Sequence, residues 1–348
     1  MEPRDIVLEQ IRHRQTRPVP YTLGWEGDVG ERLDGHFGGP EWRQRLRPYI
    51  VGTAVVDTMR KVPTETPGVW RDLYGSRWRL DRRPFHLERP ALTVPSLDAY
   101  CWPPPEQFLL TGEELAAARR RVEDASATCF TTAGLGWGLF ESSWGIRGFE
   151  DSLVDAVAHE DFHQELLDRL TDQFLAYVDY TCQQLPGVDA IMFGDDWGDQ
   201  RGVIVGPERW RRFHKPRWAR IYDRVHSHGK LVITHCCGSI VDILPDAIEI
   251  GLDVLESCQP EARGMDPYAL KQRFGAKLTF WGCLGSQSTI PFGTPEQIRA
   301  EVGRLVRELG RDGGFILAPA KALQPETPTA NAAAVVEAFT DQDSVWQV

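Results

Sequence analysis

The sequence predicts an α/β fold of the TIM-like (β/α)8 barrel type. From residue 112 to the C-terminus, strand patterns alternate with amphipathic helix patterns. The strands are apolar on both faces, which is typical of a parallel sheet covered by helices. Roughly eight such strand–helix units in a chain of this length favour a closed barrel over an open sheet. We therefore expect one barrel domain over residues 1–348.

The chain is less regular before this alternation begins. Residues 1–50 predict an N-terminal extension with short helices at 5–16 and 41–48. The first barrel strand is expected at 50–59, where β-branched and apolar residues run into polar ones. The stretch from 60 to 112 is rich in Pro, Arg and Trp, and it predicts an irregular insertion or a small antiparallel unit.

Beyond the insertion, the expected elements alternate to the end of the chain. Strands are expected at 128–136, 190–198, 231–237, 254–260, 278–285 and 314–320. Helices are expected at 112–125, 152–185 (one long helix or two abutting ones), 207–229, 239–251, 266–275, 294–310 and 331–340.

Composition excludes several classes of partner. The formal net charge is −11, whereas binding to nucleic acid or anionic membrane needs clustered Lys and Arg. No apolar stretch approaches the roughly 20 residues of a membrane span. The N-terminus is charged and lacks a secretory apolar region. Seven cysteines without the spacing of a disulfide scaffold are typical of reduced thiols, so we expect a cytoplasmic protein.

Side chains capable of chemistry gather where the expected strands end. In a TIM-like barrel, the active site lies at the C-terminal ends of the strands. These ends carry Asp57, Asp195, Asp196, His235, Cys237, Glu256, Cys258, Cys283 and Lys321.

The strongest candidate metal site is in the segment "LVITHCCGSI", residues 231–240. Side chains alternate along a strand, so His235 and Cys237 should share one face while Cys236 points the other way and packs. An imidazole and a thiolate so placed can both bind one Zn²⁺, which takes three protein ligands in a catalytic site. Cys283 is the first choice for the third ligand, ahead of Cys258, Glu256 and Asp196. The alternative is a hydrogen-bonded histidine beside an unligated thiol.

The segment "FGDDWGDQRG" (193–202) supplies a second group of candidates. Adjacent carboxylates repel, so one can carry a raised pKa and act as a general acid or base. We expect Asp196 and Gln200 to face the pocket as catalytic residues, with Trp197 and Arg201 contacting the substrate. The alternative for this cluster is that Asp195 or Asp199 caps the following helix.

Three further strand-end residues complete the candidate site. Lys321 is expected to bind a substrate carboxylate or phosphate and to take part in catalysis, the alternative being a solvated surface lysine. Asp57 and Glu256 are expected to contact the substrate.

The C-terminal half resembles the uroporphyrinogen decarboxylase superfamily. The similarity lies in "VITHCCGSIVDILPDAIEIGLDVLESCQPEARGMDPYALKQRFGAKLTFWGCLGSQSTIPFGTPEQI" and in "GGFILAPAKALQPETPTANAAAVVEAF", and it runs from about residue 185 to 340. A weaker similarity lies in "PVPYTLGWEGDVGERLDGHFG" near the start. That superfamily includes uroporphyrinogen decarboxylase and the corrinoid-linked methyltransferases, and it is similar more remotely to cobalamin-independent methionine synthase. The resemblance implies a TIM-like barrel.

Within the superfamily, the resemblance favours the methyltransferases. Their zinc site is a His-x-Cys followed by a distant Cys on the last barrel strand; His235 and Cys237 match the first two positions. Lys321 stands about where the third would be, which leaves either a replacement ligand such as Cys283 or a zinc-free site. The arginine-rich N-terminal loop of uroporphyrinogen decarboxylase is not found here.

Three functions follow from the resemblance. The first is a methyltransferase that moves a methyl group between a small substrate (methylamine, methoxy compound, thiol or folate) and a corrinoid on a partner protein. It would use zinc as cofactor or, without zinc, Asp196 and His235 as catalytic residues that position the substrate and shuttle a proton. The second is a cofactor-free decarboxylase or lyase, in which Lys321 and Arg201 hold carboxylates and Asp196 protonates or stabilises the intermediate. The third is a non-catalytic or corrinoid-binding accessory protein. A homodimer is compatible with all three.

Overall fold

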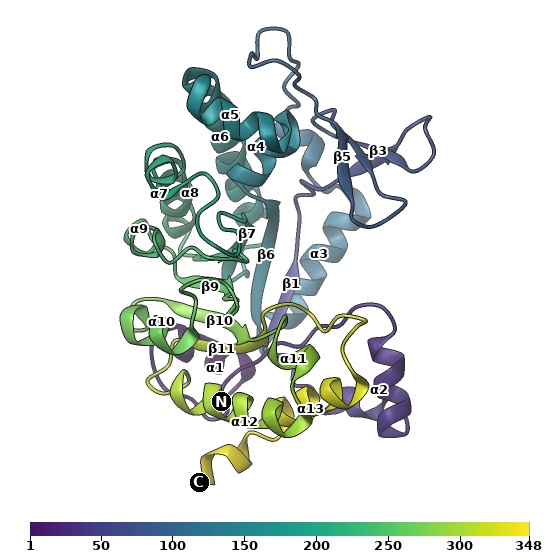
Figure 1. Ribbon diagram of the computed structural model, residues 1–348, viewed down its shortest axis with the longest axis vertical. Coiled ribbons are helices and arrows are strands. Elements are labelled where there is room, and N and C mark those ends of the chain that lie inside the picture. The colour runs from purple at the N-terminus through teal and green to yellow at the C-terminus, as the bar shows by residue number, and fades with distance from the viewer. Residues whose placement is uncertain (348) are drawn as a thin grey trace.

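The computed structural model describes residues 1–347 and has a parallel sheet at its centre (Figure 1). Seven strands lie in chain order across this sheet, each parallel to its neighbours. The strands are β1 (Ile50–Thr53), β6 (Phe130–Trp137), β7 (Ala190–Gly194), β8 (Leu231–His235), β9 (Val254–Ser257), β10 (Thr279–Leu284) and β11 (Phe315–Pro319). The sheet curls, and helices cover its outer face, so the TIM-like α/β fold is confirmed.

The helices follow the strands as expected, with additions. They are α3 (Gly112–Ala125), α4 (Leu139–Arg147), α5 (Phe149–Ala158), α6 (Glu160–Gln184), α7 (Pro207–Arg209), the π-helix η3 (Trp210–His214), α8 (Lys215–Ser227), α9 (Leu244–Glu249), α10 (Pro267–Phe274), α11 (Thr289–Phe292), α12 (Pro295–Glu308), α13 (Thr329–Thr340) and the 3-10 helix η4 (Asp343–Gln347). The stretch 152–185 falls in two abutting helices, α5 and α6. The sequence did not predict α4 or α11.

The N-terminal extension is built of three helical elements, and its first helix covers the N-terminal ends of the strands. These elements are α1 (Pro3–Ile11), α2 (Val29–Phe37) and the 3-10 helix η1 (Pro40–Arg45); α2 was not predicted. Arg4 donates its backbone N–H to the carbonyl of Thr128, just before β6, and pairs its guanidinium with Asp189, just before β7. Gln10 on the same helix accepts from the backbone of Gly314, just before β11.

The expected eighth strand of the barrel is replaced by an extended segment of the N-terminal extension. Residues 20–26 run parallel to the end of β11, with isolated bridges from Tyr21 to Leu317 and from Trp25 to Leu323. The ring of Tyr21 also packs against Tyr49, the residue before β1, with the ring centroids 5.2 Å apart. The sheet therefore has seven strands rather than eight, and this segment occupies the place beside β11.

The insertion is a separate antiparallel sheet, as the sequence predicted for this region. Its strands are β2 (Lys61–Pro63), β3 (Val69–Asp72), β4 (Arg77–Arg79) and β5 (His86–Arg89), paired in that order and followed by the 3-10 helix η2 (Pro105–Phe108). One face carries Trp78, whose ring contacts Trp137 at the end of β6 and Trp144 on α4, with centroids 5.5 and 5.9 Å away. This small sheet stands beside α3 and α4 in Figure 1.

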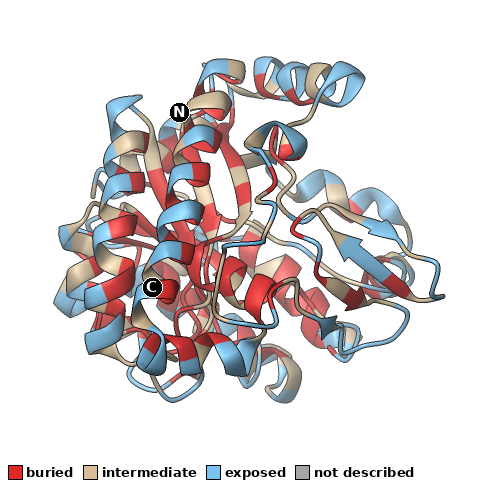
Figure 2. Ribbon diagram, turned by 90° about the horizontal axis from the view of Figure 1, so that it is seen from above, coloured by how far each residue is buried: buried red, intermediate tan, exposed pale blue. Residues whose placement is uncertain are grey.

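Burial follows the pattern expected of a helix-covered sheet. The strands and the inward faces of the helices are buried, whereas the insertion sheet is largely exposed (Figure 2). Within the described residues, no helix is both long enough and apolar enough to cross a membrane.

Candidate functional site

The C-terminal ends of β8 and β9 place the central pair of the site. His235, the last residue of β8, lies in register with Glu256 on β9, and Glu256 lies in register with Trp281 on β10. Residues paired across a parallel ladder project to the same face of the sheet. The indole nitrogen of Trp281 donates to the hydroxyl of Thr22, 2.9 Å away, on the N-terminal segment. This segment therefore borders the end of the sheet that carries the candidate site.

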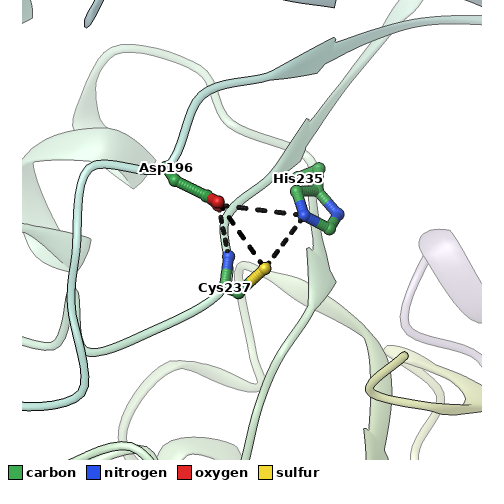
Figure 3. Close-up of side chains that lie close together, drawn as sticks. All are labelled: Asp196, His235 and Cys237. Carbon is green, nitrogen blue, oxygen red and sulfur yellow. Dashed lines mark hydrogen bonds and ion pairs between the residues drawn. The ribbon is translucent and has the colours of Figure 1, made fainter. Parts of the chain in front are cut away.

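Asp196, His235 and Cys237 converge just beyond β7 and β8 (Figure 3). The Nε2 atom of His235 lies 3.2 Å from the sulfur of Cys237 and 3.8 Å from Oδ1 of Asp196. Among residues 1–347, these are the three His, Cys, Asp or Glu donor groups that lie within 4.8 Å of one another. The prediction that His235 and Cys237 project together is confirmed.

Glu256 orients the imidazole from its other side. Its carboxylate pairs closely with Nδ1 of His235, so Nε2 is the nitrogen turned toward Cys237 and Asp196. Burial lowers the pKa of His235, but hydrogen bonds with Cys237 and Glu256 outweigh that effect and raise the pKa to about 11. The site is not sealed, because the side chains of His235 and Asp196 keep 32% and 38% of their surface exposed. All three residues of the cluster are partly exposed.

The two adjacent aspartates have different roles. Asp196 accepts the backbone N–H of Cys237 at 2.8 Å, which holds its carboxylate beside the thiol. Asp195 is fully buried and accepts from the backbone N–H groups of Phe140 and Glu141 and from the indole of Trp197. Burial raises the pKa of Asp195 to about 7, although these donors act in the opposite direction. Asp195 thus caps α4, which precedes it in the chain, and not the helix that follows it.

Glu141 is a residue of the site that sequence reasoning missed. It lies in the first turn of α4, where no local motif distinguishes it from an ordinary helix-start carboxylate. Burial, together with the nearby charges of Asp195 and Asp196, raises the pKa of Glu141 to about 9. Only the tertiary placement of α4 against the end of β7 brings this carboxyl to the cluster.

The expected third metal ligand, Cys283, lies outside the cluster. It is buried, its backbone N–H donates to the carbonyl of Cys258 at 3.2 Å, and burial and the Cys258 thiol raise its pKa well above the usual value. Ser257 and Cys283 both have positive φ, 78° and 74°, so simple strand alternation fails at these two strand ends. The third donor of the cluster is Asp196 instead. Cys236 is fully buried, as its predicted packing role requires.

Two further candidates that follow β7, Trp197 and Gln200, are not in contact with the cluster, contrary to the prediction. Trp197 is 1% exposed and packs between Trp210 and Trp218 in the core, so it is no substrate contact. Gln200 is exposed and donates to Gln259 at 3.2 Å. Residues 197–203 form a tight loop closed by a bridge between Gly198 and Val203, and the carbonyl of Asp199 in this loop accepts the backbone N–H of Ser239.

The remaining charged candidates face solvent or a local partner. Arg201 keeps 89% of its side chain exposed, 3.7 Å from Asp199. Lys321 is exposed beyond the end of β11, so the pocket position expected for it is not supported. Asp57 is half-exposed and accepts from Met59 and Arg60 in its own loop.

Comparison with known proteins assigns the chain to a family. The family model "Uroporphyrinogen decarboxylase (URO-D)" matches residues 86–342. Curated relatives include uroporphyrinogen decarboxylases from Thermus thermophilus, 28% identical over 173 residues (49% of this chain, 46% of the relative), and from Shewanella pealeana, 22% identical over 241 residues (66% and 63%). The chain thus spans about half the length of the first of these relatives and somewhat more of the second.

A solved structure similar over the whole chain is a methyltransferase from Methanosarcina mazei. It covers 99% of both chains with a TM-score of 0.70 at 18% sequence identity, which supports the fold. The family match covers most of the chain and includes β6 to β11 and all the clustered donors. This protein therefore belongs to the uroporphyrinogen decarboxylase (URO-D) family.

Proposed function

We propose that this protein is a methyltransferase whose reaction centre is a zinc site formed by Asp196, His235 and Cys237. The observation that carries the proposal is the meeting of one nitrogen, one sulfur and one oxygen donor within 4.8 Å at the C-terminal edge of the sheet. Three protein ligands with an open position are the arrangement of a catalytic zinc site.

The donor set fits zinc in type as well as in number. Imidazole, thiolate and carboxylate are the three ligand types that zinc takes in proteins. A ligating histidine commonly donates its other ring nitrogen to a carboxylate, and Glu256 occupies that position on His235. The partial exposure of His235 and Asp196 leaves room for a substrate atom at the open position. Asp196 thus replaces the third cysteine expected from the superfamily.

The chain's own residues orient the donor groups of the proposed site. A bound zinc ion would lower the pKa of a substrate thiol, so that a thiolate is available near neutral pH. Glu256 fixes the ring of His235, and the backbone N–H of Cys237 fixes the carboxylate of Asp196. In the transfer, the sulfur of the substrate thiolate forms a bond to the methyl carbon while the bond between that carbon and the methyl donor breaks. The electron pair of the broken bond stays with the donor.

The partner in this proposal is a protein that carries a corrinoid, which supplies or accepts the methyl group. The small substrate is a thiol, a methylamine, a methoxy compound or a folate. A thiol suits the site because zinc binds thiolate sulfur as a ligand. The methyltransferase from Methanosarcina mazei, with the same fold over the whole chain, is compatible with this assignment.

The proposal is tested by zinc content and by methyl transfer from methylcobalamin to a small thiol. We expect one zinc per chain in the wild type and in Cys283→Ala, and loss of zinc and transfer in Asp196→Ala and Cys237→Ser. Cys283→Ala is the matched control because it removes a thiol near the same strand ends. Zinc that depends on Cys283 and not on Asp196, or a wild type that binds none, would refute the proposed site.

Decarboxylation of a porphyrinogen is the second candidate, because the curated relatives are uroporphyrinogen decarboxylases. The two cations expected to hold substrate carboxylates, Arg201 and Lys321, are both exposed and are not part of the cluster. Turnover of uroporphyrinogen by both the wild type and Cys237→Ser would replace the methyltransferase proposal with this one.

A further inference from the structure

Three arginines lie in one row across the insertion sheet. Arg71 on β3 is in register with Arg77 on β4, and Arg77 is in register with Arg89 on β5. Residues directly opposite each other on antiparallel strands have their side chains close together on one face, so like charges there repel. Such a row is unexpected in a protein whose formal net charge is −11.

A β-bulge creates the row. Leu87 is in register with Trp78, so regular antiparallel pairing would put Glu88 opposite Arg77. The register shifts between Arg77 and Trp78, and Arg89 takes that place instead. Glu88 bonds to Arg79 at 2.6 Å. Bulges commonly re-aim a side chain, and this one exchanges a neutralising carboxylate for a third guanidinium.

Within the described residues, the positive charge of the row is only partly neutralised by acidic side chains. Arg77 pairs with the carboxylate of Glu65. Arg71 and Arg89 are exposed, and neither takes part in a hydrogen bond or ion pair between side chains in residues 1–347. Three guanidinium groups against one carboxylate leave an excess of two positive charges.

These side chains line a concave surface. A groove of about 400 Å³ is bounded by the three arginines together with Glu65, Thr64 and Pro90. Its volume is in the range of small-molecule sites. Guanidinium groups recognise phosphate and carboxylate oxygens through paired N–H donors, and several such groups in one groove favour a doubly charged oxyanion.

We propose that this groove binds a small ligand bearing a phosphate or paired carboxylates, held by Arg71, Arg77 and Arg89. The site is separate from the cluster at His235: the opposite face of β4 carries Trp78, which packs toward the barrel against Trp137. The arginine row therefore lies on the outer side of the insertion sheet. The inference does not depend on the proposed methyl transfer.

Calorimetric titration of the full chain at low ionic strength, with pyrophosphate and with citrate as probes, tests the site. We expect saturable binding of at least one probe, weakened at least tenfold in Arg71→Gln/Arg89→Gln. Both arginines are exposed, and circular dichroism checks that the variant keeps its fold. Arg82→Gln is the matched control, because it removes an exposed positive charge from the turn between β4 and β5, outside the groove.

The two probes identify the source of the negative charge. Binding of pyrophosphate alone assigns a phosphate ligand, and binding of citrate alone assigns a carboxylate ligand. Binding of neither probe by the wild type would overturn the proposal. It would also be overturned by equal weakening in Arg82→Gln, since the effect would then reflect net charge and not the row.

Discussion

Replacing Glu256 tests whether the histidine of the cluster is held for metal binding. Glu256 is paired with Nδ1 of His235, and it is the more buried of the two, with 19% of its side-chain surface exposed. Loss of a carboxylate that orients a ligating histidine typically weakens metal binding by about 10- to 100-fold. Glu256→Gln keeps the shape and an acceptor oxygen but loses the charge, and a charge-assisted hydrogen bond is about twice as strong as a neutral one.

We therefore expect zinc affinity to fall about tenfold in Glu256→Gln and about 100-fold in Glu256→Ala. In free energy, these losses correspond to about 1.4 and 2.7 kcal/mol. Competition with a chromophoric chelator measures them, and Glu31→Gln on the exposed face of α2 removes the same charge far from the site. Equal zinc affinity in Glu256→Gln and Glu31→Gln would refute the orienting role of Glu256.

Three further predictions concern the core and the adjacent thiols. Burial without a hydrogen-bond partner lowers the pKa of His163 to about 4, so below pH ~6.5 the unfolded chain binds a proton that the folded chain does not. The contribution of neutral His163 to the free energy of unfolding is therefore complete above pH ~6.5 and falls toward pH 4 by at most about 3 kcal/mol. Urea unfolding across this range checks the loss. His163→Phe should reduce the slope without abolishing it, because burial also lowers the pKa of the neighbouring His214; an unchanged slope would contradict the assignment. Asp195→Ala strips three N–H groups of their acceptor and should lower the free energy of unfolding by about 3 kcal/mol, whereas a loss below about 1 kcal/mol would show that the cap is dispensable. Cys236→Ala should retain zinc while Cys237→Ala loses it, measured as bound metal per chain; identical behaviour would contradict the opposite orientation of the two thiols.

Much of the barrel could be predicted because its strands are continuous apolar runs. All seven expected strands are present, and the expected helix at 112–125 has the bounds of α3. The helix α4 could not be predicted in the same way. Its cap is Asp195, about 55 residues away in the chain, so the sequence around Gly138 carries no capping motif. A tertiary hydrogen bond replaces the local signal on which the prediction of a helix start depends.

The candidate site was predictable only as far as single strands determine it. Alternation along β8 places His235 and Cys237 together without knowledge of any other strand. The third donor depends on the packing between strands, and Asp196 is selected by a hydrogen bond from the Cys237 backbone that no periodicity encodes. Cys283 was favoured because "FWGCLG" ends its strand on a small-residue turn; in the structure Cys283 has a positive φ and lies outside the cluster.

The pairing of residues 20–26 with the end of β11 affects how the chain folds. Its backbone exchanges two hydrogen bonds with Leu317 and two with Leu323, partners almost 300 residues later. Residues 20–26 can therefore form these hydrogen bonds only after the segment that contains β11 has been synthesised. Contacts between residues so far apart in the sequence slow folding. Until that moment β11 presents a bare edge, and removal of the first 26 residues would leave it permanently open to pairing with a second molecule.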